Sequence, residues 1–337
     1  MFPTSSPHHG AAVPATLAVL GAGAWGTVIA ALLGENGHHV RLWCRRSEVA
    51  HAIGTTRRND AYVPGLTLPA NVQPTADIAE ATLGAAAVVV AVPSRSLRET
   101  VERLSDVDVL LSVTKGFEGS GLARMSEVMQ AVHPDASVGA LSGPNLASEI
   151  ALGLPAAATL ACADDELARR AQGWLSRPTF RVYASRDVAG VEACGALKNV
   201  IALAAGMSDG LGLGANAHAA LLTRGMSELV RVGTALGGET RTFYGLAGIG
   251  DLIATCGSTR SRNHQVGVRI ARGERVEDVL ASGITAEGLA TVRHVAAYAD
   301  DTGLDLPICR EVFRVVYERK APGEAIRDLM ARAQRVE

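Results

Sequence analysis

The chain has 337 residues, with 32 Lys and Arg against 34 Asp and Glu, and a formal net charge of −2 at pH 7. This length allows two domains, at about 100–200 residues each. No basic cluster is longer than a pair, so the composition excludes an electrostatic footprint for nucleic acid or an anionic membrane surface. The five cysteines are scattered without paired spacing, which favours reduced thiols in a cytoplasmic protein and neither disulfides nor a metal site.

The N-terminal residues 1–15 contain three prolines and a His pair, without a basic segment followed by an apolar core. We therefore expect a disordered leader and not a targeting signal. No run reaches the ~18 apolar residues that a membrane span needs, so the sequence predicts no membrane span.

The segment that follows has the pattern of a dinucleotide-binding unit. An apolar run from Thr16 ends in GAGAWG, an apolar helical stretch reaches about Gly34, and a second apolar run covers 39–44. Gly21, Gly23 and Gly26 have the GxGxxG spacing, in which the glycines allow a tight turn, close approach of pyrophosphate and packing of the helix on the strand. The arrangement predicts an α/β, Rossmann-like domain that binds a dinucleotide.

Two arginines follow the second run, where an NAD-specific site would place Asp or Glu to hold the ribose 2′-OH. A guanidinium of Arg45 or Arg46 suits a 2′-phosphate instead, which predicts NADP as the main cofactor, with NAD also used. The alternative is a pair of solvated surface arginines.

Further apolar runs at 85–94, 108–116 and 137–145 predict parallel strands, the last two ending in polar, glycine-containing turns. Ligands of open α/β sheets bind beyond the carboxyl ends of the strands, which places Lys115, Gly143 and Asn145 at the site. Lys115 also fits an ordinary solvated lysine. Two more strands are expected after Pro155, and residues 54–76 are expected to form a surface excursion.

From Val188 onward helical periodicity replaces the strand pattern, so we divide the chain into a leader (1–15), a Rossmann-like domain (16–186) and an all-α domain (187–337). Within the apolar helix that opens the second domain stands one lysine, Lys198. A lysine is almost never fully buried unless something pairs with it. It is either a lysine whose ammonium reaches solvent or a desolvated group that exchanges a proton with substrate.

A glycine-rich approach at 245–250 leads to Asp251, and Ser261, Arg262 and Asn263 stand where a further helix is expected to begin. Hydroxyl, guanidinium and amide donors at a helix N-terminus make an anion site, and Arg suits bidentate phosphate recognition. The alternative is an N-cap serine followed by exposed residues.

Taken together, GAGAWGT, VPS, TKGFE, SGPN, the long segment 195–225, GLAGIGDLIATC and SRN resemble the bacterial-type NAD(P)-dependent glycerol-3-phosphate dehydrogenases. The resemblance covers most of the chain from Gly21 to Asn263. It implies a cytoplasmic homodimer that reversibly reduces dihydroxyacetone phosphate to sn-glycerol 3-phosphate with NADPH or NADH, supplying glycerophospholipid synthesis.

The resemblance also implies the site residues. Lys198 would be the catalytic proton donor and acceptor, with Lys115 and Asp251 at the reacting centre. The residues implied for the substrate are Lys115, Gly143, Asn145, Lys198, Asp251, Ser261, Arg262 and Asn263. The residues implied for the cofactor are Gly21, Gly23, Ala24, Trp25, Gly26, Arg45, Arg46, Lys115, Ala147, Arg262, Thr285 and Glu287.

The chain departs from the family pattern at three positions. Ala24 stands where Ser is usual, Asn145 where Ser or Thr is usual, and His218 where Arg or Lys is common. Two other functions fit parts of the pattern. One is a β-hydroxyacid dehydrogenase of the 6-phosphogluconate type, which shares the glycine loop and a helical lysine, and the other is a catalytically silent NADP-binding sensor.

Overall fold

The computed structural model describes residues 13–333, so most of the predicted leader lies outside the described residues. The first part of the chain forms an eight-stranded sheet in the order β10-β9-β8-β5-β4-β1-β2-β3. Its strands are β1 (Thr16–Leu20), β2 (His39–Trp43), β3 (Val72–Thr75), β4 (Ala87–Val90), β5 (Val109–Ser112), β8 (Ser137–Ser142), β9 (Ala156–Cys162) and β10 (Phe180–Ser185).

The sheet is parallel from β3 to β8. β9 pairs with β8 in the antiparallel sense, and β10 runs parallel to β9. Between β8 and β9 the chain forms only the four-residue helix α6 (Ala147–Ile150), which is too short for the crossover that a parallel neighbour requires. The first strand β1 lies between β2 and β4, so the strand order reverses there and opens a crevice at the carboxyl ends of β1 and β4.

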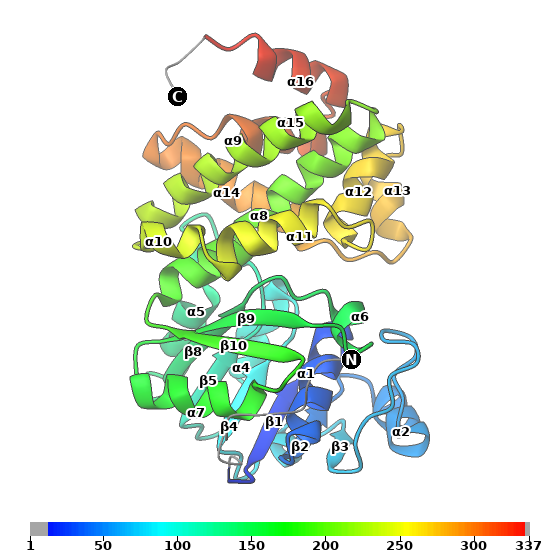
Figure 1. Ribbon diagram of the computed structural model, residues 1–337, viewed down its shortest axis with the longest axis vertical. Coiled ribbons are helices and arrows are strands. Elements are labelled where there is room, and N and C mark those ends of the chain that lie inside the picture. The colour runs from blue at the N-terminus through cyan, green and yellow to red at the C-terminus, as the bar shows by residue number, and fades with distance from the viewer. Residues whose placement is uncertain (1–12, 334–337) are drawn as a thin grey trace.

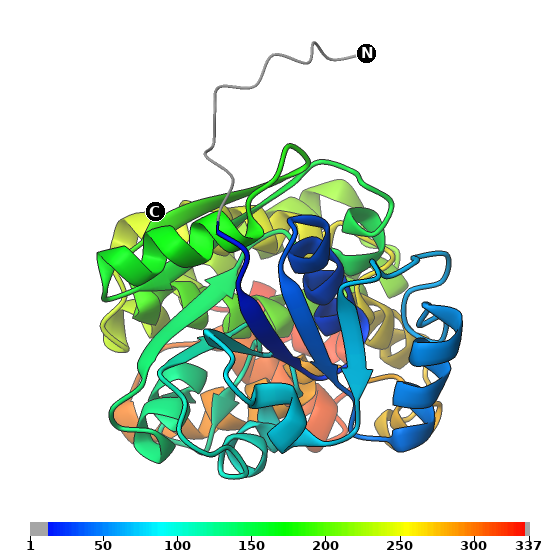
Figure 2. The ribbon, with the colours of Figure 1, turned by 90° about the horizontal axis from the view of Figure 1, so that it is seen from below.

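Helices cover both faces of the sheet because side chains along each strand alternate between two cores. Leu17 and Val19 of β1 pack with α1 and α7, whereas Ala18 and Leu20 pack with α3, α4 and α5. The helices of this domain are α1 (Ala24–Glu35), α2 (Ser47–Thr56), α3 (Ile78–Thr82), α4 (Leu97–Val101), α5 (Met125–Val132) and α7 (Asp165–Leu175). Figure 2 shows the sheet from below, with the helical domain behind it.

The predicted surface excursion at 54–76 is more ordered than expected. It contains the end of α2 and the edge strand β3. Elsewhere in the domain, a short hairpin of β6 (Phe117–Glu118) and β7 (Ala123–Arg124) follows β5. Pro74 lies within β3, which is compatible with an edge strand because only one side of it pairs.

The second part of the chain is helical and lies above the sheet in Figure 1. Helix α8 (Val188–Gly210) passes through its centre, and every residue from 190 to 208 is buried. Around it lie α9 (Gly214–Ala235), α10 (Thr240–Phe243), the π-helical turn η2 (Leu246–Gly250), α11 (Asp251–Cys256), α12 (Arg262–Ala271), α13 (Val276–Ala281), α14 (Glu287–Thr302), α15 (Pro307–Tyr317) and α16 (Pro322–Met330).

Helix α8 is the one helix of the described residues whose composition would also suit a membrane span. By length and composition this 23-residue helix is apolar enough to cross a membrane, and 89% of its most apolar window is buried inside the molecule. Two of its three charged side chains, Glu192 and Lys198, are buried and have partners within the protein. The third, Asp209, is exposed near the C-terminal end of the helix and pairs with His264. α8 is therefore a core helix of this fold.

Candidate active site

The glycine loop between β1 and α1 has the geometry of a dinucleotide cradle. Gly21 has φ +113°, a conformation that side chains rarely adopt, and a Cβ on Gly26 would lie 1.9 Å from the Gly21 carbonyl oxygen. A Cβ on Gly23 would meet nothing within 4 Å, so the loop is open on that side. Gly23 is also the N-cap of α1 and offers no capping side chain, which leaves N–H groups of the first turn for an anion.

Other residues implied for the cofactor lie around this loop and across the domain junction. Trp25 packs edge-on against Phe180, with ring centroids 6.3 Å apart. Ala24 and Ala147 each begin a helix, at α1 and α6. Glu287 begins α14 in the helical domain, and its carboxylate accepts a hydrogen bond of 2.5 Å from Ser94, which follows β4.

Both arginines after β2 are exposed. Arg46 lies 3.8 Å from Glu48, and Arg45 has no hydrogen bond or ion pair within residues 13–333. Arg46, but not Arg45, lines a cavity of about 190 Å³ between α2 and the loop 58–61. This position suits a ribose substituent, and the exposure of both side chains also fits solvated surface arginines.

At the junction of the two domains, one buried carboxylate holds both lysines. Asp251 is 1% exposed; it pairs with Lys198 through one oxygen and with Lys115 through the other, at 2.6 Å. Lys115 follows β5, Lys198 lies on α8, and Asp251 begins α11 after the π-helical turn. Lys198 also donates to the hydroxyl of Thr255, 2.6 Å away. Within the described residues these acceptors occupy two of the three N–H bonds of Lys198, which leaves one for a ligand.

The surroundings of Lys198 make it readily deprotonated. Burial lowers its pKa to about 8; the positive charge of Lys115 acts in the same direction, and the carboxylate of Asp251 opposes it. Desolvation thus outweighs the ion pair. A lysine with this pKa exchanges a proton near neutral pH, as a general acid or base must.

The turn after β8 lies next to this cluster. The ammonium of Lys115 donates to the Gly143 carbonyl at 3.1 Å, and Gly143 has φ +152°. Asn145 donates to the Ala157 carbonyl at 3.1 Å, whereas its side-chain oxygen is buried without a partner in the described chain. An unpaired buried acceptor is costly unless a ligand or water satisfies it, so Asn145 offers a hydrogen bond at the site.

The SRN segment forms the start of α12, where a helix was expected to begin. Ser261 is the N-cap, accepting from the His264 N–H, as the capping interpretation predicted. Arg262 is exposed and its guanidinium contacts the Thr285 hydroxyl. Asn263 is buried and donates to the side chain of Asn199 at 2.9 Å, the residue after Lys198 on α8. This contact joins the α12 N-terminus to the lysine cluster.

Several residues of this network were missed by the sequence analysis. Asn199 directly follows Lys198 on α8, and Thr255 lies one turn after Asp251 on α11, but no local pattern marks either as a site residue. Gly195 lies one turn before Lys198, where a Cβ would be 2.7 Å from the Ser142 hydroxyl and 3.3 Å from the Lys115 side chain. No sequence pattern distinguishes this glycine from other helical glycines. His218, the departure noted above, bonds Asp209 at 3.0 Å.

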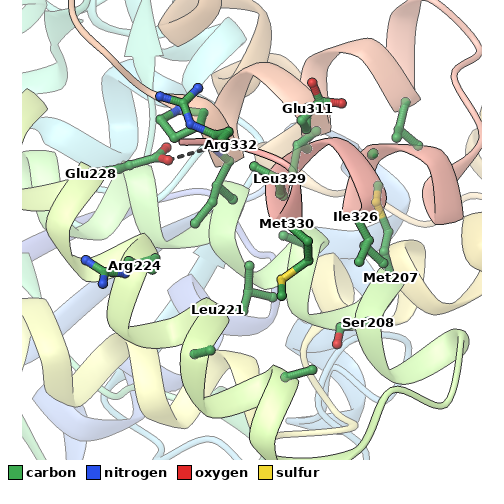
Figure 3. A pocket seen from close by; sticks show the side chains of 18 of the residues that line it. Met207, Ser208, Leu221, Arg224, Glu228, Glu311, Ile326, Leu329, Met330 and Arg332 are labelled. Atoms are coloured by element: carbon green, nitrogen blue, oxygen red, sulfur yellow. Dashed lines mark hydrogen bonds between the residues drawn. The ribbon is translucent and has the colours of Figure 1, made fainter. Parts of the chain in front are cut away.

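A larger cavity lies elsewhere, between α8, α9, α15 and α16 (Figure 3). It measures about 470 Å³ and is mostly apolar, with Leu221 of α9 and Met330 of α16 pointing toward one another across it. It contains none of the residues predicted for the active site.

A dinucleotide-type sheet joined to a helical domain, with buried Lys198 and partly buried Lys115 where the two meet, is typical of a nicotinamide-dependent oxidoreductase. Residues 16–168 match the family model of the NAD-dependent glycerol-3-phosphate dehydrogenase N-terminus, and residues 187–327 match that of its C-terminus. The chain belongs to the NAD-dependent glycerol-3-phosphate dehydrogenase family.

Individual relatives agree with this assignment. The chain is 51% identical over 323 residues to a glycerol-3-phosphate dehydrogenase (NAD(P)+) of Thermus thermophilus, covering 95% of this chain and 99% of that protein. It is 45% identical to the enzyme of that name from Moorella thermoacetica, covering 94% and 96%. The crystal structure of a glycerol-3-phosphate dehydrogenase from Coxiella burnetii matches with a TM-score of 0.91 at 35% identity, covering 95% of this chain and 99% of that one.

Proposed function

We propose that this chain reversibly reduces dihydroxyacetone phosphate to sn-glycerol 3-phosphate with NADPH or NADH. The observation that carries the proposal is the pairing of Lys115 and Lys198 with the one buried carboxylate of Asp251, where the carboxyl ends of the strands meet α8. Two positive charges beside a polar turn suit a substrate whose carbonyl oxygen becomes an alkoxide during the reaction. The bound nicotinamide supplies or accepts the hydride.

In reduction, the Lys198 ammonium donates a proton to the C2 oxygen as C2 receives the hydride; in oxidation, the neutral amine takes that proton back. Asp251 holds Lys198 in place through its ion pair, and the hydroxyl of Thr255 fixes the direction of a second N–H bond. Lys115 remains charged beside the same carboxylate and stabilises the developing alkoxide. Gly143 and Asn145 line the turn that faces the substrate.

The phosphate of the substrate is assigned to the N-terminus of α12. The guanidinium of Arg262 is exposed there, Ser261 and Asn263 supply hydroxyl and amide groups, and the helix end favours an anion. The contact from Asn263 to Asn199 supports this assignment, because a phosphate bound at the start of α12 would then lie near the residue that follows Lys198.

The cofactor is assigned to the crevice above β1 and β4. Gly21, Gly23, Ala24, Trp25 and Gly26 would hold the pyrophosphate and its neighbouring ribose at the start of α1. The remaining contacts are assigned to Arg45, Arg46, Lys115, Ala147, Arg262, Thr285 and Glu287. Because no carboxylate closes β2, we propose that NADPH is preferred over NADH, through the guanidinium groups of the two arginines.

We further propose that the protein is a cytoplasmic homodimer that supplies glycerophospholipid synthesis, with domains at 16–186 and 187–337. The end of the last strand at Ser185 and the start of α8 at Val188 support the division.

Exposed apolar side chains near the 470 Å³ cavity, with Met330 82% and Leu213 41% exposed, support self-association. Light scattering of the purified protein tests it: twice the 34.9 kDa chain mass is expected.

One assay tests the proposed reaction against the two alternatives. Oxidation of NADPH should be rapid with dihydroxyacetone phosphate and slow with unphosphorylated dihydroxyacetone, because the second substrate lacks the anion that α12 binds. Faster reduction of NADP+ with 6-phosphogluconate than with sn-glycerol 3-phosphate would instead indicate the β-hydroxyacid class. Tight NADPH binding without turnover of any of these compounds would indicate a sensor.

A further inference from the structure

The loop 57–68, between α2 and β3, is tied to the glycine loop by one side chain. After α2, Arg57 adopts a left-handed conformation, and Leu68 donates back to its carbonyl at 2.8 Å, which closes the loop on itself. Val63 and Leu68 anchor it in the hydrophobic core. Asn59 lies two residues after Arg57, ahead of both anchors, and is 5% exposed.

The amide of Asn59 uses both of its hydrogens. Its nitrogen donates to the Ala22 carbonyl at 2.9 Å and to the Thr27 hydroxyl at 2.8 Å. Ala22 lies inside GAGAWG, and Thr27 lies on the first turn of α1, completely buried. Since a carbonyl only accepts, the nitrogen of the amide must face Ala22, so the orientation of Asn59 is determined. One side chain therefore holds both the loop and the helix that begins from it.

This contact also determines where the next N–H points. In a trans peptide the C=O and the following N–H point in opposite directions, so holding the Ala22 oxygen against Asn59 turns the Gly23 N–H to the other side. The Gly23 N–H has no acceptor in the described residues, and the space beside the Gly23 Cα is open, because a Cβ there would meet nothing within 4 Å; an anion can therefore approach on that side. It is the side on which an anion would meet the N-terminus of α1.

We propose that Asn59 is a positioning residue for the dinucleotide, which keeps the peptide between Ala22 and Gly23 turned so that its N–H faces the cofactor pyrophosphate. Asn59 also lines the 190 Å³ cavity beside Arg46, and its proposed effect on the pyrophosphate acts through the Ala22–Gly23 peptide. Without it, the Ala22 carbonyl loses its buried donor and the peptide is free to rotate toward the open side. The inference rests on the assignment of the cofactor to the glycine loop.

The chain contains a matched control at the other end of the same helix. Asn71 donates to the carbonyls of Gly34 and His38, at 2.8 and 2.7 Å, and so ties the C-terminal end of α1 to the start of β3. It resembles Asn59 in residue type and in the use of both amide hydrogens, but it lies far along α1 from the glycine loop. Asn71→Ala should therefore lower the melting temperature as Asn59→Ala does, without affecting the cofactor.

The test measures KM and Kd for NADPH and NADH, and KM for dihydroxyacetone phosphate, in the parent, Asn59→Ala, Asn59→Asp and Asn71→Ala. We expect Asn59→Ala to weaken both cofactors by the same factor, roughly tenfold, because the pyrophosphate is common to them. Asn59→Asp should weaken the binding of both cofactors further, because its carboxylate would repel the Ala22 carbonyl oxygen. Asp has the same shape as Asn, so this variant keeps the test possible if Asn59→Ala does not fold. KM for dihydroxyacetone phosphate should change less than twofold.

Three results would overturn the inference. The first is that KM and Kd for both cofactors stay within twofold of the parent in both Asn59 variants. The second is that Asn59→Ala and Asn71→Ala weaken cofactor binding equally. The third is that only NADPH binding is weakened, which would place the effect on the 2′-phosphate side. Each of these presupposes an active parent. A parent that neither binds NADPH nor reduces dihydroxyacetone phosphate would contradict the proposed function instead.

Discussion

At the scale of single residues, the chemistry depends on how one carboxylate is shared. With both lysines protonated, the Lys115, Lys198 and Asp251 cluster carries one net positive charge; when Lys198 releases its proton, the remaining ion pair between Lys115 and Asp251 is neutral. The deprotonated cluster is thus well suited to a buried site, where an uncompensated charge is expensive. This explains how a lysine that is 6% exposed can alternate between its two states.

The pH dependence of the two directions should be opposite, with an inflection near pH 8, where burial places the pKa of Lys198. Oxidation needs the neutral amine, so kcat/KM for sn-glycerol 3-phosphate should rise with pH up to about 8 and then level off. Reduction needs the ammonium, so kcat/KM for dihydroxyacetone phosphate should fall above that pH. Steady-state rates from pH 6 to about 10 in both directions test this, and parallel profiles would contradict it.

The sequence predicted the residues with distinctive chemistry, namely Lys115, Lys198, Asp251 and the SRN segment, and the structure brings the first three into direct contact. It did not predict Asn199, Thr255 or Asn59. Their role depends on which partner lies opposite across a fold of long-range contacts, and a lone amide or hydroxyl carries no local pattern that reports this.

At the scale of elements, α8 brings its lysine to the sheet because a glycine allows close approach. Gly195 faces Ser142 at the end of β8 and the side chain of Lys115 after β5, and a Cβ there would lie 2.7 Å from the first and 3.3 Å from the second. Glycine inside a helix normally lowers its stability, so the presence of Gly195 in the buried centre of α8 indicates that packing requires a residue without a side chain there.

Gly195→Ala should therefore displace the Lys115 side chain relative to Lys198. We expect kcat to fall roughly tenfold to a hundredfold, since small misplacements of reacting groups are this costly, and the free energy of unfolding to fall by about 1–3 kcal/mol from overpacking. The control is Gly173→Ala in α7, where an added Cβ meets nothing within 4 Å. That variant should keep its activity and be slightly more stable; similar kcat values for both variants would refute the packing argument.

Strands buried on both faces, such as β4, were predictable because all of their residues are apolar. The edge strand β3 was not, because its four residues include a proline and two polar side chains. The antiparallel sense of β9 was also not predicted: the sequence shows that a strand is present, whereas its direction depends on the short connection after β8.

At the scale of the whole molecule, buried polar contacts join the two domains. Glu192 of α8 accepts hydrogen bonds from the backbone N–H of Ser126, at 2.9 Å, and from its hydroxyl, at the start of α5 in the sheet domain. Burial raises the pKa of Glu192 to about 7, against the effect of these hydrogen bonds. The division into a sheet domain and a helical domain was evident from the change in periodicity, but this contact between them was not.

Glu192 should make stability depend on pH. The unfolded carboxyl titrates near 4.5 and the folded one near 7, so between these values the folded state binds more protons and the free energy of unfolding falls as the pH rises. The loss is at most about 3 kcal/mol. In Glu192→Gln, which does not titrate, melting temperatures at pH 5 and pH 7.5 should differ less than in the parent. An equal difference in both proteins would show that Glu192 does not contribute.

The most direct test of the account is the turnover of Lys198→Met, because the proposed reaction depends on a proton that this one side chain gives and takes. We expect kcat for dihydroxyacetone phosphate reduction to fall by about 10²–10⁴ while Kd for NADPH stays close to that of the parent. Lys320→Met is the matched control, since Lys320 lies in the helical domain in ion pairs with Glu311 and Asp328, and it should retain full activity. A loss of less than about threefold in kcat for Lys198→Met would contradict the assignment of Lys198 as the proton donor and acceptor.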